Sequence, residues 1–283
     1  MEASRVTDGI IDAWIQHPSP GFLDDPMFST LLAWLGLHEP PQEFPLDLTL
    51  AALDAAGVER ALISAWHGPG GALISNDFVA AQIATAPDRL VGIASVDLHR
   101  PMEAVRELRR CVEDLGFRGL RMLPWLWELP PDDRRYYPLY AACVDLGVPF
   151  CLQVGHAGPR RPSEPGRPIP YLDRVAYDFP ELTIVAGHIG YPWTTEMISL
   201  ARKYERVFID TSAYKPSRYP VELVDYLRRG GRRKILFASN HPMLPPALCR
   251  SEVDALELDE ETTRLFLRDN AERVFGLDDI AKP

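Results

Sequence analysis

Eight short apolar runs, separated by segments with helical patterning, constrain this chain more than any other feature. Each run is four to eight residues long and largely uninterrupted by charge. Such runs are typical of parallel strands that are buried on both faces. The predicted strands are Gly9–Gln16, Arg60–Trp66, Leu90–Val96, Gly119–Leu123, Pro149–Val154, Leu182–Gly187, Val207–Asp210 and Lys234–Ser239.

Helical patterns fill the intervals between these runs. The predicted helices are Leu46–Ala56, Asp77–Ala86, Met102–Asp114, Tyr137–Leu146, Tyr171–Phe179, Thr194–Tyr204, Val221–Arg229 and Asp259–Val274. Eightfold alternation of strand and helix favours an α/β fold of the (β/α)8 TIM-barrel type, which takes about 250 residues. We predict one such domain over residues 1–283, with a long first loop at about residues 18–45 that forms a lid or pocket wall.

The composition of the chain limits the kinds of molecule that the protein is expected to bind. The formal net charge of −10 argues against a nucleic-acid or anionic-membrane binder, because both partners require a basic surface. No apolar stretch is long enough to span a membrane. The four cysteines form no CxxC pair, as expected of reduced thiols in a cytoplasmic protein. We therefore expect a small-molecule substrate, no nucleic-acid or membrane partner, and a cytoplasmic location.

Histidines gather where the predicted strands end. His17, His67, His156, His188 and His241 all stand at or directly after a strand end. In a barrel of this type the carboxyl ends of the strands carry the active site. Neutral imidazole is a strong ligand of zinc, manganese and iron. We predict a divalent metal site formed by His17, His67, His156 and His188; the alternative for each is a hydrogen-bonding residue of the barrel rim.

Other polar residues at strand ends complete the predicted site. Arg121 is expected to hold a substrate carboxylate, or else to form a salt bridge inside the barrel with Asp12, Asp97 or Asp210. Asp210 is expected to orient a histidine or Arg121. His241 is predicted to be a catalytic or pocket group rather than a metal ligand.

Several motifs resemble one known family. They are Ile169–Leu182, Ile184–Gly190, Gly116–Arg121, Val207–Ser212 and Asn270–Leu277. Together they resemble the amidohydrolase superfamily, in the amidohydrolase-2 branch typified by aminocarboxymuconate-semialdehyde decarboxylase. The resemblance covers nearly the whole chain. It implies a metal-dependent enzyme that acts on a small carbonyl or carboxylate compound by hydrolysis or non-oxidative decarboxylation, and a possible homodimer.

The chain departs from the family pattern at three positions. The family begins with Asp-x-His-x-His, whereas this chain has Trp14 and Gln16 in place of the two histidines. Indole is not a metal ligand, and an amide oxygen is a weak one. The family aspartate on strand eight is replaced by Asn240, which occupies the catalytic position without being able to act as a general base. Strand alternation points the next residue, His17, to the opposite face unless Pro18 bends the strand.

Three functions remain open on this evidence. The first is a hydrolase or decarboxylase with a modified ligand set. The second is a non-haem iron or diiron monooxygenase on the same barrel, acting on an apolar natural-product intermediate in a pocket of Trp14, Phe22, Phe28, Trp66 and Trp125–Trp127. The third is a metal-free binding protein or degenerate enzyme in which the Trp14 side chain fills the metal cavity.

Overall fold

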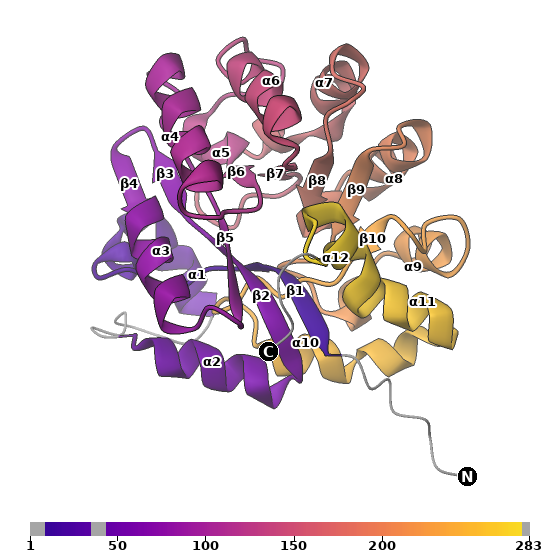
Figure 1. Cartoon of the computed structure of the whole chain (residues 1–283). Helices are drawn as coiled ribbons and strands as arrows, with labels where there is room; N and C mark the ends of the chain where they lie inside the picture. The colour runs from indigo at the N-terminus through magenta and orange to yellow at the C-terminus, as the bar shows by residue number, and fades with distance from the viewer. Residues whose placement is uncertain (1–8, 35–43, 279–283) are drawn as a thin grey trace.

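Eight parallel strands form a barrel in the computed structural model, which describes residues 9–34 and 44–278 (Figure 1). Each strand is almost entirely buried, which explains why the sequence runs are apolar on both faces. The strands are β1 (Ile10–Ile15), β2 (Val58–Ser64), β5 (Leu90–Ile93), β6 (Leu120–Met122), β7 (Phe150–Gln153), β8 (Ile184–Gly187), β9 (Val207–Asp210) and β10 (Ile235–Leu236).

The strands follow chain order around the barrel. One hydrogen-bonded group is β1-β2-β5 and the other is β10-β9-β8-β7-β6. Parallel bridges between Ala94 and Leu120 and between Ile15 and His241 join the two groups. The predicted (β/α)8 barrel is confirmed, and all eight predicted strands are present, although several are shorter than predicted.

The helices lie outside the ring of strands (Figure 1). Local sequence signals set several ends: the Ser75 hydroxyl accepts a hydrogen bond from the Phe78 backbone N–H at the start of α3, and Gly147, with φ of 67°, ends α6. The outer helices are α2 (Leu46–Ala55), α3 (Asn76–Thr85), α4 (Pro101–Glu113), α6 (Tyr137–Leu146), α7 (Asp173–Asp178), α8 (Thr194–Lys203), α9 (Val221–Arg228), α11 (Glu260–Arg264) and α12 (Asn270–Phe275). A π-helical turn at Leu265–Asp269 separates α11 from α12, where one continuous helix was predicted.

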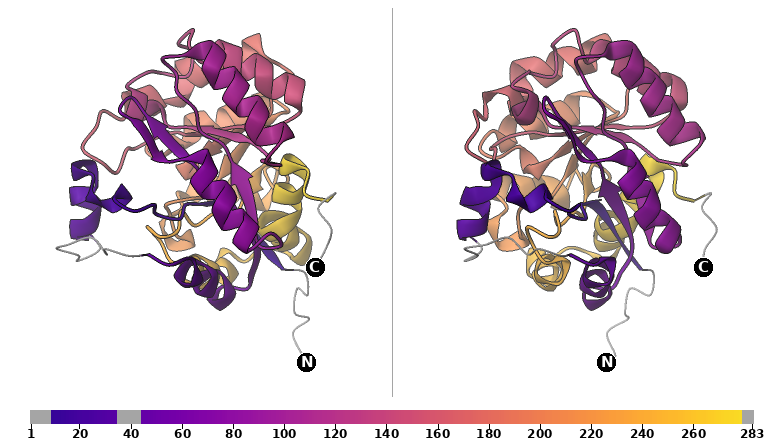
Figure 2. Two further views of the ribbon diagram at one scale, coloured as in Figure 1. Left: turned by 60° about the vertical axis from the view of Figure 1, so that its left-hand side comes forward. Right: turned by 90° about the vertical axis from the view of Figure 1, so that its left-hand side faces the viewer.

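Some elements were not predicted from the sequence. A hairpin of β3 (Trp66–Gly68) and β4 (Gly71–Ile74) follows β2, so Trp66 begins a new strand. Three short helices were also missed: α1 (Ser29–Trp34), α5 (Pro124–Trp127) and α10 (Pro246–Ser251). The described part of the predicted first loop contains α1, which lies on the side of the barrel away from α12 (Figure 2). Residues 35–43 of that loop lie outside the described residues.

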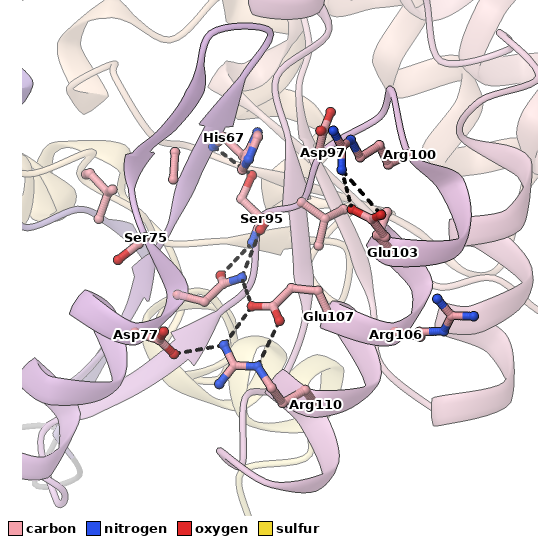
Figure 3. A pocket seen from close by; sticks show the side chains of 15 residues that line it. His67, Ser75, Asp77, Ser95, Asp97, Arg100, Glu103, Arg106, Glu107 and Arg110 are labelled. Carbon is pink, nitrogen blue, oxygen red and sulfur yellow. Dashed lines mark hydrogen bonds and ion pairs between the residues drawn. The ribbon is translucent and has the colours of Figure 1, made fainter.

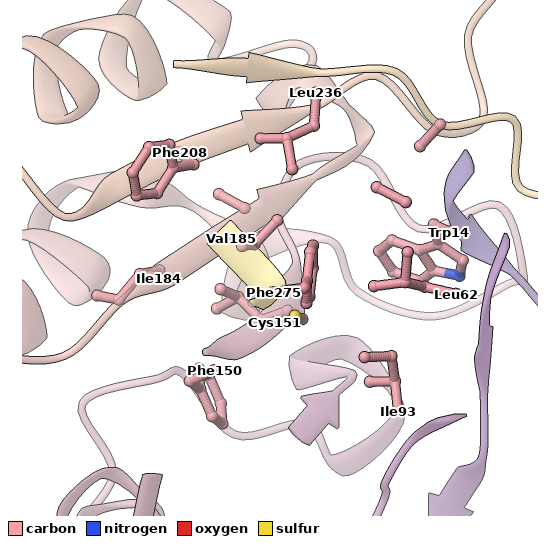
Figure 4. Packing of buried hydrophobic residues seen from close by; sticks show 14 of the residues in the cluster. Trp14, Leu62, Ile93, Phe150, Cys151, Ile184, Val185, Phe208, Leu236 and Phe275 are labelled. Atoms are coloured by element: carbon pink, nitrogen blue, oxygen red, sulfur yellow. The ribbon is translucent and has the colours of Figure 1, made fainter. Parts of the chain in front are cut away.

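The barrel interior is filled by large side chains. Trp14 of β1 is fully buried and shares this core with Leu62, Ile93, Cys151 and Val185 (Figure 4). The centre of the barrel is thus a packed core, and the open space lies at its rim. No helix within residues 9–34 and 44–278 is long and apolar enough to cross a membrane.

Candidate active site

A cavity of about 440 Å³ lies at the carboxyl ends of the strands. It has an apolar side and a polar side. The apolar side includes Phe22, Leu23, Phe28, Trp66, Trp125, Met243 and Leu244. The polar side includes Gln16, Gln153, His156, His188, Tyr214 and Asn240. Of the predicted pocket aromatics, Trp14 and Trp127 do not line this cavity.

Within residues 9–34 and 44–278, the side chains that line the cavity contain no carboxylate, guanidinium or ammonium group. Their polar groups are amides, imidazoles, indole N–H groups and the Tyr214 hydroxyl. Gln153 is engaged on both sides, because its Oε1 accepts from Trp125 Nε1 at 2.7 Å and its Nε2 donates to the His156 carbonyl at 2.9 Å. Gln153 therefore holds the Trp125 ring in place, and such a pocket suits a flat ligand with a hydrogen-bonding end.

His188 is the most completely positioned imidazole of the cavity. It follows β8 directly, and its φ of 65° places the backbone in the left-handed region, so the strand ends there. Its Nδ1 lies 2.7 Å from Ser212 Oγ. Burial and the nearby Arg121 charge lower the pKa of His188 to about 3, so the ring is neutral near pH 7.

Ser212 and Asp210 determine which nitrogen of His188 carries the proton. Ser212 Oγ donates its single hydrogen to Asp210 Oδ1, so it can only accept from His188 Nδ1. His188 therefore has Nδ1–H and a lone pair on Nε2, the nitrogen left to meet a ligand. Asp210 reaches His188 through Ser212, and its role in orienting this histidine stays a prediction. Ser212 was not predicted from the sequence, where its position two residues after Asp210 was the available signal.

The residues that replace the family histidines form one hydrogen-bonded chain. Trp14 Nε1 donates to Gln16 Oε1 at 3.0 Å, and Gln16 Nε2 donates to Asn240 Oδ1 at 3.1 Å and to the His241 carbonyl at 2.7 Å. The Trp14 ring lies against His188, with centroids 4.7 Å apart. A Cβ at Gly187 would lie 2.3 Å from the Trp14 ring, so the glycine is required for this packing.

Arg121 lies beneath this site and does not line the cavity. Its side chain is 1% exposed, and its guanidinium packs on the Trp14 ring at 3.7 Å from the centroid. It donates to Ser64 Oγ and to the Ala13 carbonyl, and lies 4.0 Å from Asp210 Oδ2. The expectation that Arg121 holds a substrate carboxylate is therefore wrong, and the alternative, a barrel-core salt bridge with Asp210, is what the structure shows.

His17 does not join His156 and His188. Its Nδ1 lies 2.9 Å from Thr49 Oγ1, and its ring packs between Phe44 and Phe78, with centroid distances of 5.5 and 5.9 Å. The alternation of β1 continues past Gln16 and points the two side chains apart, so the predicted place of His17 in the metal site is wrong.

His67 is also separate from the other predicted ligands. It lies in the β3–β4 hairpin, where its ring stacks on Trp127 and its Nδ1 lies 3.0 Å from the Gly68 carbonyl. It lines a second, charged cavity of about 590 Å³ between the hairpin, α3 and α4 (Figure 3). The unpredicted hairpin carries His67 out of the barrel mouth, so its predicted metal role is wrong as well.

His241 and Asn240 follow the last strand. Asn240 lines the cavity, as expected from its position at a strand end, with φ of 70°. His241 is 6% exposed, and both of its ring nitrogens lack a hydrogen-bond partner in the described part of the chain. Burial lowers the pKa of His241 to about 4. It is absent from the residues that line the cavity, so a direct role for it stays a prediction.

A metal-ligand cluster is not assembled by the part of the chain that the structure describes. No group of three or more histidine, cysteine, aspartate or glutamate side chains there could hold one ion. The predicted four-histidine set is reduced to His156 and His188 on one cavity, and their role as ligands stays a prediction.

Comparison with known proteins places the chain in a family. An amidohydrolase family model (Amidohydro_2) matches residues 24–277. A gamma-resorcylate decarboxylase of Rhodococcus jostii is 27% identical over 72% of this chain and 76% of its own. An uncharacterised TIM-barrel protein of Bordetella bronchiseptica is 27% identical, covers 95% of this chain and 99% of its own, and has a TM-score of 0.82.

A decarboxylase structure adds a ligand and a metal in a related fold. The dihydroxybenzoic acid decarboxylase of Polaromonas, solved with manganese and the inhibitor 2-nitroresorcinol, has a TM-score of 0.71 at 20% identity over 96% of this chain and 98% of its own. The iron monooxygenase alternative finds no support in these comparisons, whereas an enzyme of the hydrolase or decarboxylase type is supported. By the extent of the family match, this chain belongs to the amidohydrolase family.

Proposed function

We propose that this chain catalyses the non-oxidative decarboxylation of a small hydroxyaromatic carboxylic acid in the 440 Å³ cavity. The observation that carries the proposal is the neutral His188 ring, with its tautomer set by Ser212 and Asp210, beside an aromatic slot. One relative, the gamma-resorcylate decarboxylase of Rhodococcus jostii, acts on a compound of this class.

The reaction requires a group that moves one proton. The bond between the ring carbon and the carboxylate breaks, carbon dioxide leaves, and the bonding electron pair takes up a proton at the ring carbon. Because its pKa is low, His188 Nε2 accepts a hydrogen bond from the neighbouring ring hydroxyl without taking its proton, and this hydrogen bond enriches the ring in electrons. A water molecule that enters through the cavity mouth, where His156 is exposed, delivers the proton to that carbon.

The apolar side of the cavity supports the same reaction. A flat ring is expected to lie against Phe22, Trp66 and Trp125, whose side chains exclude water from its faces. Loss of carbon dioxide turns an anionic group into a neutral one. The described lining residues offer no cation to the substrate carboxylate, and such a lining disfavours the carboxylate relative to the transition state.

A divalent metal is supported by the comparisons, since the Polaromonas enzyme binds manganese. The donor set of this chain does not fit one. Trp14 packs against His188, and the amides of Gln16 and Asn240 bond to each other in place of charged or imidazole donors. The proposed reaction therefore uses only the side chains of this chain and water.

Turnover of gamma-resorcylate tests the proposal. The purified protein is expected to convert gamma-resorcylate into resorcinol and carbon dioxide. Chromatography detects the resorcinol, and a coupled assay detects the carbon dioxide. His188→Gln removes the Nε2 lone pair at a similar volume, and we expect a loss of about a hundredfold or more in kcat. Equal kcat values in the two proteins would reject His188 as the group that hydrogen-bonds the substrate hydroxyl, and no turnover of any hydroxyaromatic acid would reject the function.

A further inference from the structure

We infer that the cavity binds its aromatic ligand without a resident divalent metal ion, because Trp14 packs against His188, the buried Arg121 cation packs on Trp14, and the amides of Gln16 and Asn240 bond to each other. The identity of the ligand rests on the proposed function. The inference about the metal rests on the packing of these side chains alone.

The Trp14 indole takes the space that an ion beside His188 would need. It is fully buried, its ring centre lies 4.7 Å from that of His188, and Arg121 Cζ lies 3.7 Å from the centre of the indole. Gly187 allows the ring to lie directly on the β8 backbone. An ion in contact with the inner side of His188 would therefore have to displace a fully packed tryptophan.

The two amides are committed to each other. Gln16 accepts from Trp14 through Oε1 and donates through Nε2 to Asn240 Oδ1. These bonds fix both amide oxygens as acceptors of N–H groups. Turning Gln16 Oε1 to an ion would remove the acceptor of the buried Trp14 N–H, and turning Asn240 Oδ1 to an ion would remove one acceptor of the Gln16 amide.

Arg121 already provides a positive charge at this depth. Its guanidinium faces the Trp14 ring from below, and Asp210 Oδ2, 4.0 Å away, balances it. Asp12 adds a second nearby carboxyl that acts on Arg121. A divalent ion beside His188 would be repelled by this cation, which cannot move away because Arg121 is 1% exposed.

Metal content gives the first test. Protein expressed in medium supplemented with manganese and zinc is expected to retain below about 0.1 ion per chain by mass spectrometry. Calorimetric titration of chelator-treated protein with Mn²⁺ or Zn²⁺ is expected to show no one-to-one binding. Near-stoichiometric metal that His188→Ala abolishes would overturn the inference.

A variant with restored donors provides the positive control. Trp14→His, Gln16→His and Asn240→Asp together supply three donors next to His156 and His188, and this triple variant should gain about one ion per chain. Trp14→Phe is the matched variant without new donors, and it should gain none. Circular dichroism establishes that each variant is folded. If Trp14→Phe takes up as much metal as the triple variant, the lack of donor side chains is not one of the causes that exclude the ion.

Ligand binding separates this inference from the proposed function. Quenching of tryptophan fluorescence by 2-nitroresorcinol is expected, because Trp66 and Trp125 line the cavity. Its Kd should change by less than about twofold after chelation. A tenfold weakening would overturn metal independence even where gamma-resorcylate is turned over. If the protein decarboxylates none of the acids tested, but binds 2-nitroresorcinol equally well after chelation and holds negligible metal, the proposed decarboxylase activity is rejected. The inference that the cavity works without a metal ion is then retained.

Discussion

The guanidinium carbon of Arg121 lies 3.7 Å from the centre of the Trp14 ring, and both side chains are buried in the middle of the barrel. The contact combines a cation–π interaction with the charge of Asp210, whose Oδ2 lies 4.0 Å from Arg121. It connects the floor of the cavity to the barrel core. The stability of the fold and the shape of the site therefore depend on the same residues.

Removing the Arg121 charge should destabilise the fold. Arg121→Met keeps the volume and leaves Asp210 buried without its counter-charge, so we expect the free energy of unfolding to fall by about 3–5 kcal/mol. Urea denaturation followed by circular dichroism measures the change. Adding Asp210→Asn should recover part of the loss, because the unpaired carboxylate is then gone; a double variant less stable than the single one would argue against this pairing.

Ser212 is expected to act as a positioning residue for His188. Ser212→Ala removes the acceptor of His188 Nδ1–H, so the ring can rotate or change tautomer. We expect kcat for gamma-resorcylate to fall by about a hundredfold while KM changes little. Ser212→Thr retains the hydroxyl and should recover most of the rate. If Ser212 had only a structural role, Ser212→Ala would be less stable, but kcat would not fall selectively while KM stays nearly constant.

The barrel could be predicted because its signal is repeated along the chain. Each strand is buried on both faces, so runs such as Ile184–Gly187 stand out from the patterned helices around them. The site positions of His156 and His188 were predictable for the same reason, since a residue that directly follows a parallel strand lies at the barrel mouth.

The site residues whose positions differ from the prediction depend on contacts between segments far apart in the sequence, which the pattern of a single strand does not reveal. His67 was expected at the mouth, but the β3–β4 hairpin carries it to another cavity. The burial of Arg121 depends on Trp14 and Asp210, which come from strands far apart in the sequence. The replacements at Trp14, Gln16 and Asn240 were visible in the sequence, whereas their mutual hydrogen bonding was not.

The buried carboxyl of Asp12 should make stability depend on pH. Burial raises its pKa to about 7 in the folded protein, against 3.8 as its ordinary value. The folded state thus binds the proton more tightly, and stability is lost as pH rises from about 4 to about 7. Asp12→Asn removes this proton and still accepts from the Trp14 and Ser239 N–H groups.

Urea denaturation at several pH values tests the role of Asp12. The stability of Asp12→Asn relative to the natural protein should increase as pH rises through this window, and level off above about pH 8. A difference between the two proteins that is constant from pH 4 to pH 8 would show that Asp12 is ionised throughout.

His241 should make the protein sensitive to acid. Burial lowers its pKa from 6.5 to about 4 in the folded state, so below about pH 6.5 the unfolded chain takes up a proton that the folded chain excludes. Stability is then lost as pH falls toward 4. The His241 ring lies 6.2 Å from the Phe44 ring, measured between centroids, and His241→Phe keeps an aromatic ring at this place. The substitution removes no side-chain hydrogen bond that the described residues make. We expect this variant to unfold at higher urea than the natural protein at pH 5 and to differ less at pH 8; the reverse order would mean that the imidazole is charged and paired in the folded protein.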